Sequence, residues 1–272
     1  MSMGEFGALL PGEHKERALN GTRWITRCAC LLLMMLLPVC AAMGESARGD
    51  LAGRFADVPQ VECGGETYYL RSRLTAIMAA GILPDAQDGA PRAEFVAVFA
   101  IDDGEKRITP IRIDGQTLVE FAGETLPLRD VFAQDGEPEE RCLRLRAAVD
   151  ALLGGGLIVD YAAVDLDGIT AVDAFSHLAG DARERLRQLR MTVKDTPARE
   201  LYALYGEIGD CLITNMKSGA VMRSLDKSER YEIAEAAELP VLPARTGGDA
   251  PEPDAEGIQK LVIDVFYAEA LF

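Results

Sequence analysis

The chain is poor in histidine and in basic residues. Its 272 residues include two histidines, His14 and His177, and the formal net charge is −16. A Ser-His-Asp triad, a Cys-His pair or an HExxH zinc site would each have to use His177, and no nucleophile motif accompanies it. Nucleic acid is disfavoured as a partner because phosphate binding needs a basic surface. Chemistry in this chain is therefore expected to use carboxylates and arginines, with or without a metal.

Motifs for nucleotides, zinc ribbons and thiol redox chemistry are also missing. The glycine run Gly154–Gly156 fits neither GxxxxGK[ST] nor GxGxxG, and no CxxC pair occurs. Of the six cysteines, Cys63, Cys142 and Cys211 lie beyond the N-terminal apolar run described next. An odd number leaves at least one free thiol, and the sequence cannot select one disulfide among the three pairs.

An apolar run near the N-terminus has the order of a secretory signal. The basic stretch Lys15–Arg27 precedes the apolar run Cys28–Met43, which ends among small residues. The run is shorter than the ~20 residues of a membrane-spanning helix, although an uncleaved anchor stays open as an alternative. We predict a signal peptide or membrane anchor over residues 1–44, a linker over 45–64 and one folded domain over 65–272. The protein is then extracytoplasmic, in the cell envelope, either secreted or held at the membrane by its leader.

Beyond the linker, strand and helix patterns alternate. Leu74–Ile82 and Phe95–Ile101 are apolar throughout, which is typical of strands buried on both faces, although the first also fits a helix. Arg107–Ile113 alternates and should form a hairpin with the preceding strand across the Asp-Gly turn. The other predicted strands are Gly65–Tyr69, Gln116–Phe121, Ile158–Val164 and the extended Tyr231–Leu242. The predicted helices are Glu139–Leu153, Ile169–Leu178, Arg183–Met191, one that begins at Thr196-Pro197, Lys217–Leu225 and Ile258–Leu271. Interleaved strands and helices indicate a layered α/β domain.

Two kinds of charged cluster are candidates for chemistry. The acidic turns Asp102-Asp103 and Asp165–Asp167 follow predicted strands, and each fits a capped turn better than a metal site. Basic residues are densest in the helix that contains Arg183, Arg185, Arg187 and Arg190. Arginines three or four apart share a helix face, so this cluster is either a phosphate site or a solvated surface.

Two segments carry a series of motifs. The first, Leu74–Phe121, contains LTAIMAAGI and RAEFVAVFAIDDGEKRITPIRIDGQTLVEF. The second extends to Ala174 and contains ALLGG and VDYAAVDLDGITAVDAF, and LVIDVFY lies near the end of the chain. As a series these motifs resemble the LytR-CpsA-Psr (LCP) family, and LVIDVFY resembles the end of its short relatives.

The resemblance implies a layered α/β/α domain with a central mixed sheet. Members of this family are exported, membrane-attached proteins that transfer a glycopolymer from a polyprenyl-diphosphate carrier onto peptidoglycan. The diphosphate is held by arginines and by a divalent metal, magnesium or manganese, on aspartates, so positioning and charge neutralisation carry most of the rate. A hydrophobic slot for the polyprenyl tail is also implied.

Several family positions carry different residues in this chain. The Arg-Asp-Thr turn falls on Gly115, Gln116 and Thr117, and an acidic position falls on Leu83. Glu94 retains a carboxylate where the family has aspartate, so the resemblance implies that Glu94 holds the metal. It implies that Arg183 and Arg187 hold the diphosphate as the catalytic arginines.

Three hypotheses follow. The first is a phosphotransferase of the LCP type that attaches glycopolymer to peptidoglycan and is either weakly active or degenerate. The second is a non-catalytic partner protein that binds the polyprenyl lipid or the glycan. The third is an exported interaction domain without a ligand slot.

Overall fold

A computed structural model describes residues 60–84, 90–195, 198–217, 227, 230–242 and 250–269. The predicted leader over residues 1–44, and the predicted linker up to residue 59, lie outside these ranges, so both stay predictions. Within the described ranges, no helix combines the length and the apolar character needed to cross a membrane.

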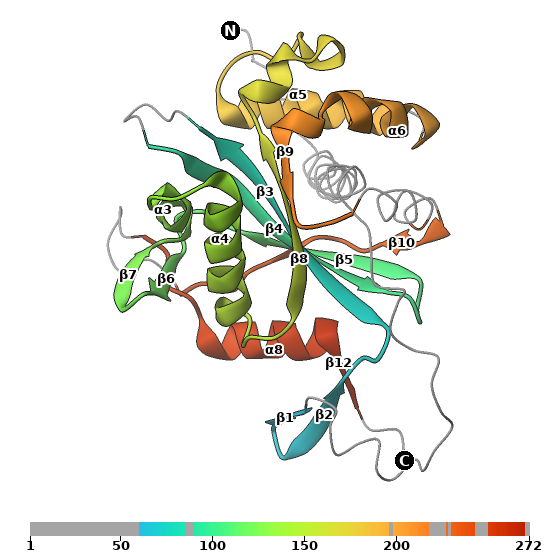
Figure 1. Cartoon of the computed structure of the whole chain (residues 1–272). Helices are drawn as coiled ribbons and strands as arrows, with labels where there is room; N and C mark the ends of the chain where they lie inside the picture. Colours follow the sequence, from blue (N-terminus) through green and yellow to red (C-terminus); the bar gives the residue numbers. More distant parts are fainter. Residues whose placement is uncertain are drawn as a thin grey trace, which may run out of the picture.

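The core of the fold is a mixed sheet, as predicted. Its strands run in the order β10-β5-β4-β3-β8-β9 (Figure 1), and β11 also pairs with β5. Strand β3 is antiparallel to β4 and parallel to β8, and β4 is antiparallel to β5, which confirms the predicted hairpin. The strands are β3 (Leu74–Leu83), β4 (Arg92–Asp102), β5 (Arg107–Ile113), β8 (Ile158–Asp165), β9 (Leu212–Thr214), β10 (Glu232–Ile233) and β11 (Ala237–Glu238).

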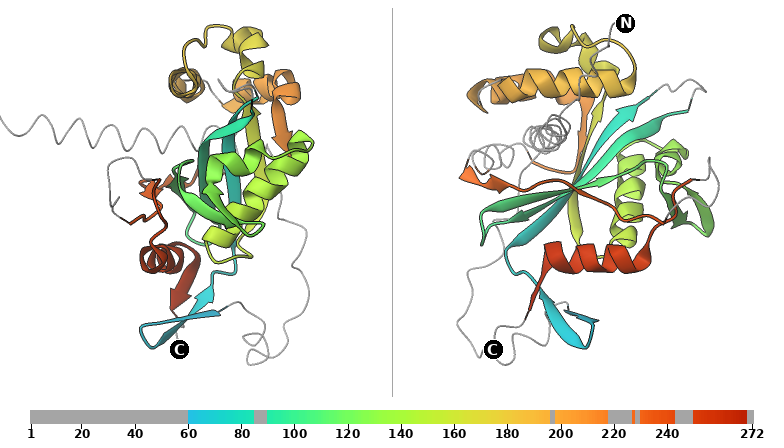
Figure 2. Two further views of the ribbon diagram at one scale, coloured as in Figure 1. Left: turned by 90° about the vertical axis from the view of Figure 1, so that its left-hand side faces the viewer. Right: turned by 180° about the vertical axis from the view of Figure 1, so that it is seen from behind.

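Helices cover both faces of this sheet, which confirms the α/β/α layers (Figure 2). One face of β4, with Val96 and Val98, packs against α3 (Leu128–Ala133), α4 (Pro138–Leu152) and α8 (Ala255–Phe266). The opposite face, with Ala97 and Phe99, packs against α5 (Ala182–Asp195) and α6 (Ala198–Glu207). Alternate residues of one apolar strand thus reach two separate cores, as period-2 geometry requires.

The two ends of the described chain meet in a small second sheet. Strands β1 (Gln60–Cys63), β2 (Glu66–Leu70) and β12 (Tyr267–Glu269) form it in the order β1-β2-β12. The folded region therefore begins by Gln60, inside the segment predicted as linker, and the last helix ends at Phe266 instead of Leu271. Arg71 Nε donates to the Tyr267 carbonyl oxygen at 3.0 Å, which holds the C-terminal strand in place.

Two other predicted segments differ from the structure. The predicted helix over Ile169–Leu178 is two short 3-10 helices, Gly168–Ala171 and Asp173–Phe175, because Val172 between them has extended backbone. The predicted third strand, Gln116–Phe121, is shorter in the structure, where β6 covers Leu118–Phe121. Strand β6 lies outside the central sheet and pairs with β7 (Glu124–Pro127). The Thr196-Pro197 helix start and residues 218–225 lie outside the described residues.

The three cysteines of the described chain are all free thiols. Cys142 lies in α4 among the apolar residues under the sheet, and Cys63 and Cys211 are half-buried. Burial, together with the charge of Glu139, raises the pKa of the Cys142 thiol to about 12. Because the thiolate is the reactive form, Cys142 is protected both sterically and chemically.

We expect iodoacetamide to modify the half-buried Cys63 and to leave Cys142 unmodified in the native protein, because α4 buries Cys142 and little of its thiol is in the reactive thiolate form. Mass spectrometry after a timed pulse, with and without urea, provides the measurement. Modification of Cys142 at the rate of Cys63 without urea would show that α4 does not bury this thiol.

Candidate functional site

The ends of four strands gather at one edge of the central sheet. Leu83, the last residue of β3, pairs with Arg92, the first residue of β4. Ile82 pairs with Asp165, the last residue of β8, and β5 ends at Ile113 on the same side. In α/β sheets ligands bind beyond the carboxyl ends of the strands, so this edge, referred to below as the β3 edge, is the candidate site.

Glu94 lies at this edge on a β-bulge. Gly81 pairs with Phe95 and Ile82 pairs with Ala93, so Glu94 is the extra residue on β4. Its side chain is exposed, whereas Ala93 beside it is fully buried. Bulges redirect side chains next to functional sites, and this one places a carboxylate at the rim of the β3 edge.

The described residues do not form a preformed metal site. Among them, no group of three or more His, Cys, Asp or Glu side chains could hold a metal ion. At the β3 edge the neighbouring position at the end of β3 is the apolar Leu83, which supplies no second ligand beside Glu94. A magnesium ion commonly uses one or two carboxylates plus substrate phosphates and water, so Glu94 by itself does not fit an ion held before substrate arrives.

The turn after β5 packs tightly against β4. Asp114 organises it, since its carbonyl oxygen accepts from Thr117 N–H and its Oδ1 accepts from Gln116 N–H, both at 2.9 Å. A Cβ atom at Gly115 would lie 3.1 Å from the Ala93 carbonyl oxygen. Thr117 is fully buried. Backbone therefore occupies the space in which a side chain at position 115 would begin.

Helix α3 adds two charged side chains to this turn. The Arg129 N–H donates to the Gly115 carbonyl oxygen at 2.9 Å, which ties the helix to the turn. Asp130 Oδ1 lies 3.6 Å from Arg129 Nε and 3.9 Å from Arg92 Nε. The three side chains are 28%, 34% and 26% exposed for Arg129, Asp130 and Arg92, so each is accessible but partly shielded. Sequence reasoning did not single out Arg92 or Arg129.

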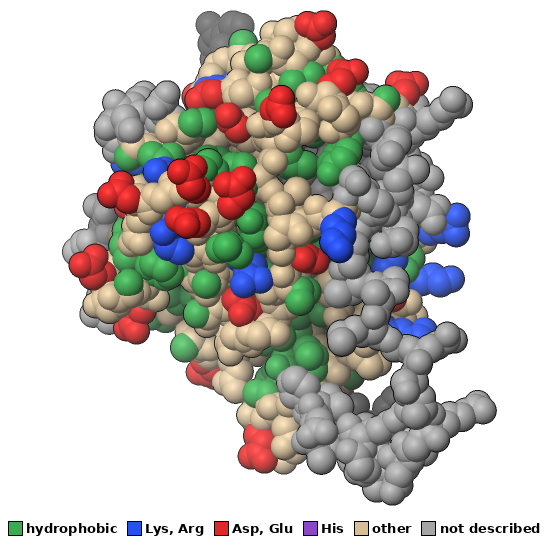
Figure 3. All heavy atoms as spheres, viewed as in Figure 1, with side chains coloured by type: hydrophobic (Ala, Val, Ile, Leu, Met, Phe, Trp, Pro, Cys, Tyr) green, Lys and Arg blue, Asp and Glu red, His purple; other side chains and the backbone are tan. Residues whose placement is uncertain are grey.

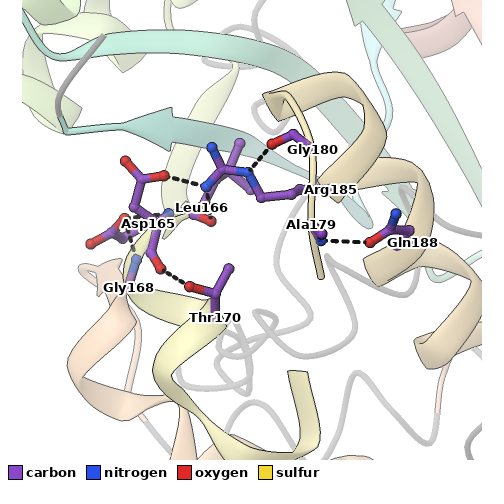
Figure 4. Close-up of polar contacts among 9 residues, drawn as sticks. Asp165, Leu166, Gly168, Thr170, Ala179, Gly180, Arg185 and Gln188 are labelled. Carbon is purple, nitrogen blue, oxygen red and sulfur yellow. Dashed lines mark hydrogen bonds and ion pairs between the residues drawn. The ribbon is translucent and has the colours of Figure 1, made fainter. Parts of the chain in front are cut away.

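Among the arginines of α5, the structure brings Arg185 to the end of β8. Its Nη1 donates to the Leu166 carbonyl oxygen at 2.9 Å and forms an ion pair with Asp167. Its Nε donates to the Gly180 carbonyl oxygen at 3.1 Å (Figure 4). Arg185 thus serves to hold α5 against the turn after β8, with 17% of its side chain exposed.

Arg187, one of the two predicted catalytic arginines, points to a different side of α5. Its guanidinium donates to Glu184 one turn away, and this pairing is the main reason that the pKa of Glu184 falls to about 2. Helical spacing separates Arg187 from the buried Leu189 by about 200°, because each residue turns about 100°. The side chain of Arg183, the other predicted catalytic arginine, lies outside the described residues. The roles predicted for Arg183, Arg187 and Glu94 stay predictions.

The acidic turns are organised by their own backbone, in agreement with the interpretation as capped turns. Asp165 Oδ1 accepts from the N–H groups of Asp167 and Gly168, each at 2.9 Å. Asp102 Oδ1 accepts from Gly104 N–H at 2.8 Å. These hydrogen bonds account for the carboxylates without a metal.

Comparison with solved structures identifies the fold. The chain matches Bacillus subtilis TagV with a TM-score of 0.52 at 13% identity, covering 72% of this chain and 97% of TagV. It matches TagT bound to LI-WTA with a TM-score of 0.52 at 10% identity, covering 71% and 90%. TagV and TagT are LCP-family proteins. The fold is LCP-like.

A third match is the B. subtilis protein described as the transcriptional regulator yvhJ, with a TM-score of 0.53 at 16% identity, covering 72% of this chain and 96% of that one. No protein-family model matches the chain, and no curated protein matches its sequence. The LCP-like domain shares its fold with these proteins at identities that leave its chemistry to be argued from its own residues.

We expect Arg185→Ala to destabilise the fold by about 1–3 kcal/mol, because it leaves the carbonyl of Leu166 and the Asp167 carboxylate without their charged partner. Arg187→Ala removes the same charge from an exposed position and should leave urea unfolding unchanged. In Arg187→Ala the pKa of Glu184, followed by NMR, should rise from about 2 towards its ordinary value, while the hydrogen bond from Gln188 continues to lower it. Equal unfolding midpoints for the two variants would contradict this assignment.

We expect Gly115→Arg to weaken the fold instead of restoring the family's arginine, because the new Cβ meets the Ala93 carbonyl 3.1 Å away and Arg129 Cβ 3.4 Å away. Crowding of this kind typically costs about 1–3 kcal/mol. Gly209→Arg, where the Cβ meets nothing within 4 Å and φ is not in the left-handed region, controls for the added side chain without crowding. A rise in thermal stability of Gly115→Arg would overturn the packing argument.

Proposed function

We propose that this protein acts in the cell envelope on a glycopolymer linked to a polyprenyl-diphosphate carrier, and that its reaction is attachment of that polymer to peptidoglycan. The observation that supports the proposal is the LCP-like fold, which covers nearly the whole of TagV and of TagT. TagT has been solved with LI-WTA and with LIIa-WTA. The sequence patterns over Leu74–Ala174 support the same class of protein independently of the fold.

The chemistry proposed is phosphoryl transfer, which depends on holding the diphosphate and neutralising its charge. At the β3 edge, Glu94 and Arg92 carry charge, whereas Leu83, Gly115 and Gln116 do not. Each electrostatic interaction that such a site lacks lowers the rate of transfer by roughly 10²–10³-fold. The proposed transfer activity is therefore slow. The alternative is that the protein binds the carrier lipid or the glycan without turnover.

The residues proposed to act remain those implied by the family resemblance. Arg183 and Arg187 hold the diphosphate, and Glu94 is the carboxylate for a magnesium or manganese ion if the protein is active. Among the described residues, no cluster of side chains would hold the metal in advance of substrate. If diphosphate release from a polyprenyl-diphosphate donor survives the double substitution Glu94→Ala and Arg187→Ala, these roles are wrong.

The location of the protein belongs to the same proposal. The basic stretch and apolar run before residue 44 would export the chain and, if uncleaved, hold it at the membrane beside its lipid-linked substrate. Regulation of transcription, the description given to yvhJ, is disfavoured for this chain because a net charge of −16 opposes DNA binding.

We expect LI-WTA to bind the purified protein in a calorimetric titration, with TagT as the positive control. We also expect release of the diphosphate carrier to be at least about 10²-fold slower than with TagT, since the site has fewer charged side chains. Turnover equal to that of TagT would refute the hypothesis of a degenerate site. Absence of LI-WTA binding, with TagT binding under the same conditions, would refute the choice of substrate.

A further inference from the structure

Two apolar side chains are exposed where helix α4 meets strand β8. Leu143 on α4 is 43% exposed, and Val159 on β8 is 48% exposed. Arg146, one turn after Leu143, joins the two elements, because its Nη1 donates to the Val159 carbonyl oxygen at 2.9 Å. Single exposed apolar residues are common on protein surfaces, whereas exposed apolar residues on adjoining elements form a patch that can bind a partner.

A β-bulge turns Val159 outward. Ile158 pairs with Ala76 and Asp160 pairs with Ile77, so Val159 is the extra residue on β8. Ile158 beside it is buried. Bulges redirect a side chain without ending the strand. The exposure of Val159 is therefore a consequence of how β8 pairs with β3.

The backbone of β8 next to Val159 is already hydrogen-bonded. Strand β9 pairs with β8 only between Ala162 and Val164. Before these residues the side chain of Asn215 takes the place of a strand, since its Oδ1 accepts from Tyr161 N–H at 2.9 Å and its Nδ2 donates to Asp160 Oδ1 at 3.0 Å. A partner could not add a strand here without displacing Asn215, so we expect a partner to dock through side chains.

One cation and one anion flank the apolar pair. Arg146 and Asp160 are both half-buried, whereas the acidic side chains of this face gather over α3 and the start of α4 (Figure 3). In a chain with a net charge of −16, two copies repel each other wherever acidic surfaces meet. A surface with one charge of each sign is therefore where two copies can approach at a low electrostatic cost.

We propose that this surface, referred to below as the α4/β8 patch, binds a second copy of this chain across a twofold axis; the patch consists of Leu143, Arg146, Val159 and Asp160. A twofold contact brings the same patch of both copies together, so Arg146 of one copy faces Asp160 of the other and the apolar pairs cover each other. With the two α4 helices antiparallel, their acidic first turns point apart. Val159 lies near the start of β8 and the β3 edge lies beyond its end, so the dimer leaves the candidate site open and does not depend on the proposed function.

Sedimentation velocity of the purified full chain, in one non-ionic detergent and over a series of protein concentrations, tests the proposal. We expect an equilibrium between monomer and dimer. Leu143→Glu and Val159→Glu should each raise the dissociation constant of the dimer by about tenfold or more, because a charge enters a contact that excludes water. Met191→Glu is the matched control, since Met191 on α5 is also exposed, at 41%, and the change in net charge is equal. We expect this control to leave the dissociation constant unchanged.

Three outcomes would overturn the proposal. A monomer at every concentration would leave the α4/β8 patch to a different partner. Equal weakening by Met191→Glu would reduce the effect to overall charge. A dimer that neither Leu143→Glu nor Val159→Glu weakens would place the contact elsewhere in the chain, the predicted leader included.

A mixture of two variants tests the twofold contact itself. Arg146→Asp and Asp160→Lys each bring like charges together in their own dimers, so each variant alone should dimerise more weakly than the wild type. In an equal mixture every contact pairs opposite charges, and the dimer should return. Changes within one chain, such as loss of the hydrogen bond to Val159, persist in the mixture and cannot produce this recovery. Folded variants that do not recover on mixing would refute the twofold contact; if either variant fails to fold by circular dichroism, the glutamate variants decide.

Discussion

The double burial of β3 is the constraint on which the rest of the structure depends. This strand pairs with β4 on one side and with β8 on the other, and its residues Ala76, Met78, Ala79 and Ala80 are fully buried. Such a strand has no tolerance for a shift in register, because a slip by one residue would exchange the two cores. Its pairing therefore determines which strand ends meet at the β3 edge.

Small side chains on β3 allow the covering layer to come close. A Cβ at Gly81 would lie 3.2 Å from Leu166 Cδ1, so the residue after β8 packs directly on the backbone of β3. Leu166 in turn offers its carbonyl oxygen to Arg185 of α5. The close contact between Gly81 and Leu166 thus helps to position α5 on the sheet. It also gives Arg185, among the arginines of α5, a structural role.

The charge at the β3 edge depends on the side chains that lie there and cannot be inferred from the net charge of the whole chain. The chain is strongly acidic, and in the space-filling view acidic side chains gather over α3 and α4 with a few basic ones among them (Figure 3). Field effects are screened beyond a Debye length of about 8–10 Å, so an exposed acidic helix and a partly buried pair of arginines can coexist in one small domain. Net charge therefore argues against an extended polyanion such as DNA, but not against a single diphosphate.

The sequence by itself determined most strands and helices, through apolar residues that repeat every 2 or every 3.6 positions. The hairpin of β4 and β5, the long helix α4, the strand β8 and the α/β class were all predictable, because each is a local pattern of apolar residues. The family resemblance also pointed to Glu94 and Gly115, which the structure places at the same edge of the sheet. The arginines of the basic helix could not be told apart in this way, since they look equivalent until the buried face is known.

Only the tertiary structure decided the remaining points. The bulge at Glu94 depends on pairing with β3, the strand β12 forms because β2 offers it a free edge, and Arg129 reaches Gly115 because α3 folds back over the turn. Each of these contacts joins residues that are far apart in the sequence, and no local sequence pattern predicts it. Local propensity determines which segments form helices and strands, whereas long-range hydrogen bonds and packing determine where their side chains lie. The chemistry of the β3 edge depends on the positions of side chains, so it could not be predicted from local propensity.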